Sequence, residues 1–114
     1  MKKKTFCFDL DNTLCTTKDK YYGKSKPKKG AIKTLNYLYS KGHIVKIYTA
    51  RFMGRSNDEL RNHKKLYSEV SKQLKNFGIK YHKLFLSKPS ADTYIDDKAY
   101  GYSRSWIKKF RKKF

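Results

Sequence analysis

The sequence predicts a single α/β domain, with a parallel sheet that carries helices on both faces. The length of 114 residues suits one domain of ordinary size. Short apolar runs rich in Phe, Ile, Val and Tyr alternate with longer segments whose apolar residues recur at helical spacing. No repeat, low-complexity tract or linker divides the chain. Because alternating strands and helices are typical of a helix-covered parallel sheet, residues 1–114 are expected to form one domain.

The first half of the chain holds two expected strands and one helix. Residues 5–9 form an apolar run that ends in an acid, as a buried strand does. Lysines, two glycines and a proline follow, and they predict a long basic loop over about 16–30. Residues 31–41 carry apolar side chains at helical spacing and stop at Gly42. Residues 43–49, rich in Ile, Val and Tyr, predict a second buried strand.

The second half repeats this alternation. A Ser and a Glu at 56–59 form a capping-box pattern before a long amphipathic stripe that ends at a glycine, which predicts a helix. Residues 81–86 predict a third strand, and 93–95 a short fourth one. The tail, 100–114, is basic and aromatic, and 105–114 is compatible with a terminal helix. Together these elements describe a Rossmann-like domain.

The chain has 29 basic against 9 acidic side chains, a formal net charge of +20. Lysine supplies 24 of the cations and arginine only 5. Proteins that read nucleic-acid sequence favour arginine, whose planar fork contacts phosphates and guanine edges bidentately. Since the lysines are spread along the chain, we interpret the charge mainly as solvated surface that attracts anions in general. A specific polyanion site, an acidic partner and a membrane surface remain open alternatives.

Several classes of protein are excluded. The longest apolar runs span a few residues, too short for a membrane span. The basic start resembles that of a signal peptide, but Asp9 and Asp11 interrupt the apolar run that should follow. Cys7 and Cys15 provide neither a disulfide framework nor zinc spacing. We therefore expect a reduced, cytoplasmic protein in which Cys7 is a small core residue of the first strand.

The acids are few, and two pairs of them follow predicted strands. Asp9 and Asp11 stand at the carboxyl end of the first strand, where open α/β sheets bind ligands. Residues two apart in extended backbone project to the same side, and adjacent carboxylates usually share a proton or hold a cation. Asp96 and Asp97 repeat the situation after the fourth strand, whose end we expect beside the first. Carboxylate oxygens suit magnesium better than zinc, so the acids predict a Mg²⁺ site.

Four short motifs occur in order along the chain. Residues 9–13 read Asp-Leu-Asp-Asn-Thr after an apolar strand, and residues 44–49 form an apolar strand that ends in threonine. Lys88 lies downstream, and the acid pair at 96–97 comes last. This set resembles the four motifs of haloacid dehalogenase superfamily phosphatases. Residues 87–99, together with the Thr-Ala-Arg element at 49–51, further resemble small members found among capsule-polysaccharide biosynthesis proteins.

The resemblance implies a role for each position. Asp9 would be the nucleophile that attacks phosphorus, and Asp11 the acid, then base, that serves the leaving oxygen and the water. Lys88 would neutralise the phosphoryl oxygens and hold Asp9 ionised. Thr49 and the backbone N–H of Ala50 would bind the same oxygens. These roles describe hydrolysis of a phosphate monoester through an aspartyl-phosphate.

The resemblance also implies the metal ligands and leaves one arginine open. Mg²⁺ would bind Asp9, the backbone carbonyl of Asp11, and Asp96. Asp97 would support the site. Arg51, just beyond the phosphate-binding threonine, would either contact the leaving group of the substrate or be a solvated loop residue.

The intervals between the motifs leave no room for a cap domain, since 40 positions separate Asp9 from Thr49 and 39 separate Thr49 from Lys88. We therefore expect a capless hydrolase of a small phosphorylated substrate, with sugar phosphates or capsule precursors favoured. Without a cap, the site must be shielded from bulk water in another way. We therefore expect either a homo-oligomer, in which a second subunit covers the site, or a bulky substrate that covers it. The loop at 21–29 could close part of the opening. Two alternatives stay open: a phosphatase of nucleotides or nucleic-acid ends, and a basic nucleic-acid-binding module with an inactive core.

Overall fold

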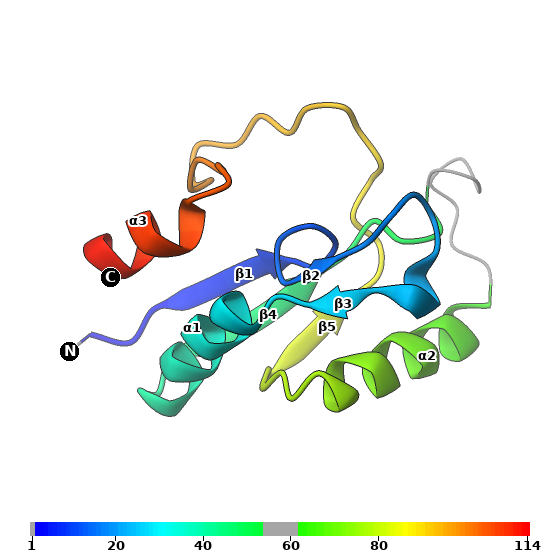
Figure 1. Ribbon diagram of the computed structural model, residues 1–114, viewed down its shortest axis with the longest axis horizontal. Coiled ribbons are helices and arrows are strands. Elements are labelled where there is room, and N and C mark those ends of the chain that lie inside the picture. The colour runs from blue at the N-terminus through cyan, green and yellow to red at the C-terminus, as the bar shows by residue number, and fades with distance from the viewer. Residues whose placement is uncertain (1, 54–61) are drawn as a thin grey trace.

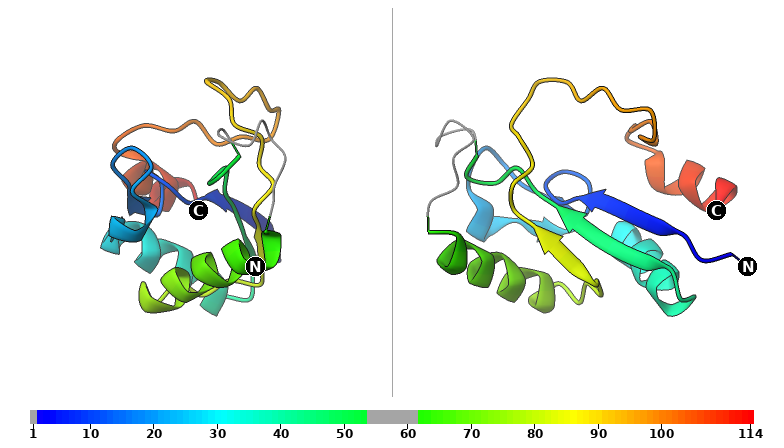
Figure 2. Two further views of the ribbon diagram at one scale, coloured as in Figure 1. Left: turned by 90° about the vertical axis from the view of Figure 1, so that its right-hand side faces the viewer. Right: turned by 180° about the vertical axis from the view of Figure 1, so that it is seen from behind.

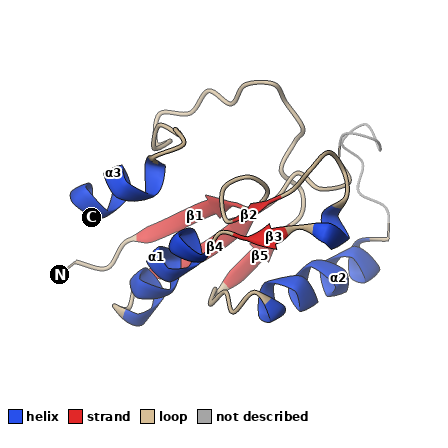
Figure 3. Ribbon diagram, viewed as in Figure 1, coloured by secondary structure: helices blue, strands red, loops and turns tan. Residues whose placement is uncertain are grey.

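The computed structural model describes residues 2–53 and 62–114, whose path is shown in Figure 1 and whose helices and strands are marked in Figure 3. The elements in chain order are β1 (Thr5–Asp9), β2 (Cys15–Thr16), the 3₁₀ helix η1 (Tyr22–Lys24), β3 (Lys26–Pro27), α1 (Lys29–Ser40), β4 (Ile44–Tyr48), α2 (His63–Asn76), β5 (Lys83–Phe85) and α3 (Trp106–Lys113). The capping box expected at Ser56 and Glu59 lies outside the described residues. No helix in the described part is long and apolar enough to cross a membrane.

Strands β1, β4 and β5 form a parallel sheet with β4 in the middle. The register places Asp9 opposite Tyr48 and Tyr48 opposite Phe85, so the three strands end level with one another. α1 connects β1 to β4, and α2 lies between β4 and β5 in the chain, as parallel strands require. Three expected strands are therefore confirmed, each within two residues of its predicted bounds.

Helices α1 and α2 lie on the same face of the sheet (Figures 1 and 2). Their buried side chains share one core with Phe8, Val45 and Ile47. In the order β1-β4-β5, each connection moves to the next strand in the same direction across the sheet. Because such connections are right-handed, both helices lie on the same face. On the other face Ile44 is 43 % and Phe85 40 % exposed. Within residues 2–53 and 62–114 the helices thus do not cover both faces, and for this part of the chain that expectation is wrong.

The open face also corrects the prediction for Cys7. Side chains alternate along a strand, and Phe8 in β1 projects into the core. Cys7 must therefore project to the opposite face, where its side chain is exposed. Cys15, in contrast, is buried. Cys7 is thus a residue of the open sheet face and not of the core.

Residues 93–95 do not form the expected fourth strand. Residues 86–105 contain neither helix nor strand, and Ile95 is 97 % exposed. α3 packs beside β1 instead, with the Phe110 ring centroid 5.7 Å from that of Phe6 and 6.1 Å from that of Phe8. Residues 93–95 carry one large aliphatic side chain and would bury less apolar surface than the aromatic rings of α3. Packing of α3 beside β1 is therefore the more favourable arrangement.

Two glycines end the first two helices as predicted. Gly42 follows α1 with φ of +87°, and Gly78 follows α2 with φ of +74°. Side chains are rarely tolerated in this left-handed region, so glycine ends a helix there at little cost. Both turns lead the chain back toward the amino end of the sheet.

The segment expected to be a long basic loop is more ordered than predicted. β2 pairs antiparallel with β3, with Cys15 opposite Pro27 and Thr16 opposite Lys26. The Lys28 amide donates to the Leu14 carbonyl at 2.9 Å and continues this pairing. The short hairpin fixes the chain that follows β1 close to the carboxyl end of the sheet.

Candidate functional site

Asp9 ends β1 at the carboxyl end of the sheet, with its side chain 37 % exposed. The Lys88 Nζ lies 3.3 Å from Oδ1, and the Thr13 hydroxyl donates to Oδ2 at 3.2 Å. Burial raises the pKa of the Asp9 carboxyl above its ordinary value, while Lys88 and Thr13 oppose that shift. Asp9 is thus an accessible carboxylate beside one ammonium group, which suits attack on an anionic substrate.

Lys88 reaches Asp9 from the segment after β5. Its backbone N–H donates to the Thr49 carbonyl at 3.3 Å, which fastens the segment to the end of β4. Its Nζ also lies 4.2 Å from the centroid of the Tyr94 ring, within range of a cation–π contact. The structure thus places Lys88 beside Asp9, while its roles toward Asp9 and a substrate stay predictions.

Asp11 faces a different partner. Arg51 Nε lies 2.9 Å from Oδ2 of Asp11, and Arg51 Nη2 lies 2.8 Å from Oδ1. The Thr17 hydroxyl donates to Oδ1 at 2.5 Å. The Arg51 side chain is only 3 % exposed and that of Asp11 is 21 % exposed. Asp11 is therefore part of a bidentate, largely buried ion pair.

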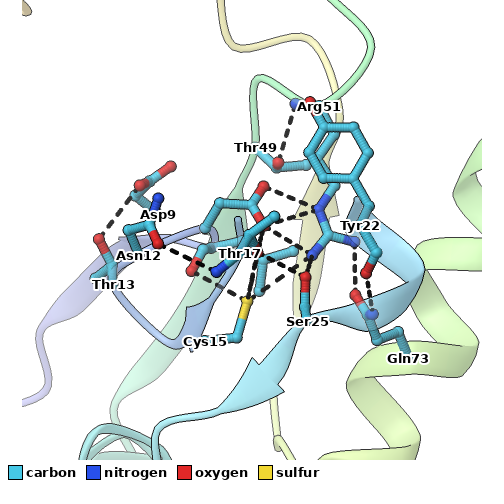
Figure 4. A network of polar contacts seen from close by, with 12 residues as sticks. Asp9, Asn12, Thr13, Cys15, Thr17, Tyr22, Ser25, Thr49, Arg51 and Gln73 are labelled. Carbon is cyan, nitrogen blue, oxygen red and sulfur yellow. Dashed lines mark hydrogen bonds and ion pairs between the residues drawn. The ribbon is translucent and has the colours of Figure 1, made fainter. Parts of the chain in front are cut away.

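Arg51 joins three segments of the chain, and Figure 4 shows it with Tyr22, Ser25 and Gln73. Its Nη1 donates to Gln73 Oε1 at 2.6 Å, and Gln73 Nε2 donates to the Tyr22 carbonyl at 2.6 Å. The Tyr22 ring centroid lies 4.9 Å from the guanidinium carbon, and Nη2 is 3.4 Å from Ser25 Oγ. Arg51 is therefore not the solvated loop residue that was one of its two expected roles. We call Asp11, Arg51 and Gln73 the arginine clamp.

Sequence reasoning missed three contributors to the clamp and its surroundings: Thr17, Ser25 and Gln73. Thr17 and Ser25 lie in the segment interpreted as a loop, where no periodicity marks a buried hydroxyl. The position of Gln73 could have been recognised from the sequence. It lies three residues after Val70, at the edge of the apolar stripe of α2. A polar residue at such a position needs a buried partner.

Thr49 and Ala50 form the turn that orients Arg51. Thr49 is buried, and its hydroxyl accepts the Arg51 backbone N–H at 3.1 Å. The Thr49 amide donates to the Phe85 carbonyl at 2.9 Å, and the Ala50 carbonyl accepts the Met53 amide at 3.1 Å. These contacts fix the exit from β4, while contacts of Thr49 and Ala50 with a phosphoryl group stay predictions.

Asp96 and Asp97 are not assembled with Asp9 and Asp11. Both are exposed, and the Asp96 carboxylate accepts the Lys98 amide at 2.8 Å within a local turn. Across residues 2–53 and 62–114, no group of three or more His, Cys, Asp or Glu side chains is placed to hold a metal ion. The strand that would have carried Asp96 to β1 is not formed by residues 93–95, so Asp96 does not join Asp9. As arranged, these residues do not fit the expected magnesium site.

A hollow of about 340 Å³ lies beside the arginine clamp, between η1 and α2. Its walls include Tyr22, Phe52, Gln73 and Phe77 as well as Arg51. Neither Asp9 nor Lys88 is among the described residues that line it. The hollow thus adjoins the clamp and not the candidate nucleophile.

Comparison with known proteins bears on the fold. No family model matches the chain, and no curated protein matches it. The chain is similar to the crystal structure of a structural-genomics target from Vibrio cholerae, with a TM-score of 0.73 and 24 % identity over 96 % of this chain and 98 % of that one. At this identity the likeness shows the fold alone, a small α/β domain with a parallel three-stranded sheet.

Proposed function

We propose that this chain is a phosphomonoesterase that transfers the phosphoryl group of its substrate first to Asp9 and then to water. The observation that carries the proposal is the half-exposed Asp9 carboxylate with the Lys88 ammonium 3.3 Å away. Open parallel sheets bind ligands at their carboxyl ends, where both groups lie. The ordered motifs that resemble haloacid dehalogenase phosphatases support the same chemistry.

Asp9 would carry out the first step. A bond forms between its carboxylate oxygen and phosphorus while the bond from phosphorus to the leaving oxygen breaks. The attack needs the ionised carboxylate, and burial, which raises the pKa of Asp9, works against it. Lys88 lowers that pKa and would also offset the charge of the transferred phosphoryl oxygens.

Water would complete the turnover. It attacks phosphorus, the bond to the Asp9 oxygen breaks, and inorganic phosphate leaves while the carboxylate is restored. Asp11 is the candidate for giving a proton to the leaving oxygen and taking one from the water. Arg51 would hold the Asp11 carboxylate in place. Among the described residues, Oδ1 accepts hydrogen bonds from Thr17 and Arg51, whereas Oδ2 accepts one from Arg51, so Oδ2 is the better candidate for proton transfer.

Dependence on Mg²⁺ is proposed from the acids of the sequence. The arrangement of Asp9, Asp11 and Asp96 does not assemble three ligands, and no chemical step above involves the ion. Turnover measured with Mg²⁺ and with a chelator therefore tests whether the reaction depends on the ion. Sugar phosphates are the favoured substrates, because the narrower resemblance of the motifs is to small capsule-polysaccharide biosynthesis proteins.

The test is turnover of a panel of phosphate monoesters by the full chain, with Mg²⁺ and with a chelator. The panel holds sugar phosphates, nucleoside monophosphates and a 5′-phosphorylated oligonucleotide. We expect turnover of sugar phosphates. We also expect phosphorylation of Asp9, detected by mass spectrometry. Absence of turnover on every ester under both conditions would count against the proposal. Turnover of nucleotides alone would support the alternative substrate class.

A further inference from the structure

The amino end of the sheet, opposite to Asp9, gathers lysines and aromatic rings. Both chain termini lie at this end in Figures 1 and 2. The cluster is made of residues before β1, at the end of α1 and at the end of α3. We call it the amino-end cluster, and its members are Lys2, Lys3, Lys4, Tyr37, Lys41, Lys113 and Phe114.

Two hydrogen bonds of its backbone fix Lys4 within the amino-end cluster. The Lys4 amide donates to His43 Nδ1 at 3.0 Å, and the Lys4 carbonyl accepts the Ile44 amide at 2.9 Å. The ammonium groups of Lys4 and Lys113 lie 5.3 and 5.4 Å from the centroid of the Phe114 ring. Lysines from opposite ends of the chain therefore converge on one ring.

No acidic side chain neutralises this surface. Residues 2–4, 29–44 and 98–114 contain no Asp or Glu. Within the described part of the chain, both ion pairs lie at the other end of the sheet. α3 extends the positive surface with exposed Lys108, Lys109, Arg111 and Lys112. Such an uncompensated field attracts polyanions, whose binding releases condensed counterions.

The amino-end cluster surrounds a hollow of about 320 Å³. The hollow is lined by Lys2, Lys4, Phe6, Tyr37, Leu38, His43, Lys113 and Phe114. The Tyr37 ring is 50 % exposed and has the Lys41 ammonium 5.5 Å from its centroid. Cations beside an accessible aromatic ring are typical of single-strand sites, where cations contact phosphates and rings stack on bases.

We propose that the amino-end cluster binds single-stranded nucleic acid without sequence preference. Its lysines contact backbone phosphates as point charges, and Tyr37 stacks on an unpaired base. The apolar side chains of α3, Trp106 and Phe110, are buried in the core, so α3 offers no apolar face to a membrane. The surface lies away from Asp9, and this proposal does not rest on the proposed phosphatase activity.

Fluorescence anisotropy of a labelled oligodeoxythymidylate tests the surface. A strand of about 12 nucleotides spans one such site. At about 0.15 M salt, we expect the triple variant Lys4→Gln, Lys41→Gln, Lys113→Gln to bind about tenfold more weakly or worse than the native chain. Its slope of log affinity against log salt should shrink by about 2, since each lost phosphate contact contributes about 0.7.

Tyr37→Ala separates stacking from charge. We expect binding weaker by roughly fivefold or more, because stacking on an aromatic ring contributes to the affinity of each base. The salt slope should stay near that of the native chain, since no cation is removed. Tyr37 is on the surface of α1, so this variant decides the question if the triple variant fails to fold.

A matched control removes the same charge elsewhere. Lys64, Lys65 and Lys72 are exposed on α2, and the variant with glutamine at all three should bind nearly as the native chain. Equal weakening by both triple variants would overturn the proposal, because net charge alone would then explain binding. Absence of binding, or binding to anionic vesicles in preference to the oligonucleotide, would also overturn it. Phosphate-ester turnover, measured in parallel, should be unchanged in all these variants.

Discussion

The two acids of the first motif lie two positions apart, yet they occupy contrasting regions of the molecule. Asp9 is 37 % exposed and has the Lys88 ammonium 3.3 Å away. Asp11 is held at 2.8 and 2.9 Å by Arg51, whose side chain is almost wholly buried. One carboxylate is left accessible, while the other is fixed into the framework of the fold.

This difference separates reactivity from stability. Burial raises the pKa of Asp9, so its charged form costs free energy in the folded state. The Asp11 carboxylate, in contrast, meets a buried cation that would be left unpaired without it. We therefore expect changes at Asp9 to affect mainly turnover, and changes at Arg51 and Gln73 to affect mainly the free energy of unfolding. Asp11, which pairs with Arg51 and is the candidate proton donor, should affect both.

The largest expected effect is that of Asp9→Asn. The amide keeps the shape but removes the attacking charge, so turnover should fall by about three orders of magnitude or more. Thermal unfolding should show that the variant is folded. Asp92→Asn, which changes an exposed acid, is the matched control and should keep native turnover. Near-native turnover of Asp9→Asn would exclude the covalent mechanism.

Lys88→Met should lower turnover by about 10²-fold, because a preorganised cation at the phosphoryl oxygens is lost. It should also change the pH profile. Lys88 lowers the pKa of Asp9, so the pKa rises further without it, and the acidic limb of the rate profile moves to higher pH. Lys88→Arg should keep the limb close to its native position. An unmoved limb in Lys88→Met would show that the two groups do not interact in solution.

The raised pKa of Asp9 also predicts how stability changes with pH. The folded state binds the Asp9 proton more tightly than the unfolded chain does. The free energy of unfolding should therefore fall as the pH rises from the ordinary carboxyl pKa of 3.8 through the raised value. Urea titrations at several pH values should show this contribution in the native chain and its loss in Asp9→Asn.

Arg51→Met should reduce the free energy of unfolding by about 3 kcal/mol, because the Asp11 carboxylate loses its buried partner. Adding Asp11→Asn should recover part of that loss, since no uncompensated charge then remains. Arg104→Met, at an exposed arginine, should leave the urea midpoint unchanged. Equal midpoints for Arg51→Met and Arg104→Met would show that the clamp is not formed in solution.

The smallest expected effect is that of Gln73→Ala. It removes the acceptor for Arg51 Nη1 and the donor to the Tyr22 carbonyl, a loss of about 1 kcal/mol. Asn76→Ala, at an exposed position of the same helix, is the control for helix propensity. A loss no greater than that of the control would remove Gln73 from the clamp.

The sequence predicted what depends on local pattern. Strand β1 and the glycines that end α1 and α2 follow from short-range signals. That Lys88 would act beside Asp9 was implied by the resemblance of the motifs, and the two groups do lie 3.3 Å apart. The face covered by α1 and α2 depends on the order of strands across the sheet, which no local pattern contains.

The remaining differences come from competition between distant segments. Residues 93–95 resemble a strand locally, but the aromatic rings of α3 pack beside β1. Arg51 resembles a loop residue locally, but Asp11 and Gln73 reach it from segments 40 and 22 positions away and bury it. In each case the missing information was the identity of the partner, which only the folded arrangement supplies.

The two cysteines provide a direct measure of local opening. Partial desolvation by its neighbours raises the pKa of the exposed Cys7 thiol, and burial raises that of Cys15; both shifts slow the reaction with alkylating reagents. A reagent can still reach Cys7 on the open sheet face, whereas Cys15 is buried under Arg51, with its sulfur 3.8 Å from Nη2. Alkylation of Cys15 therefore requires the segment after β1 to detach from the clamp. Its rate relative to Cys7, read by mass spectrometry of the native chain, reports how often the folded protein opens there.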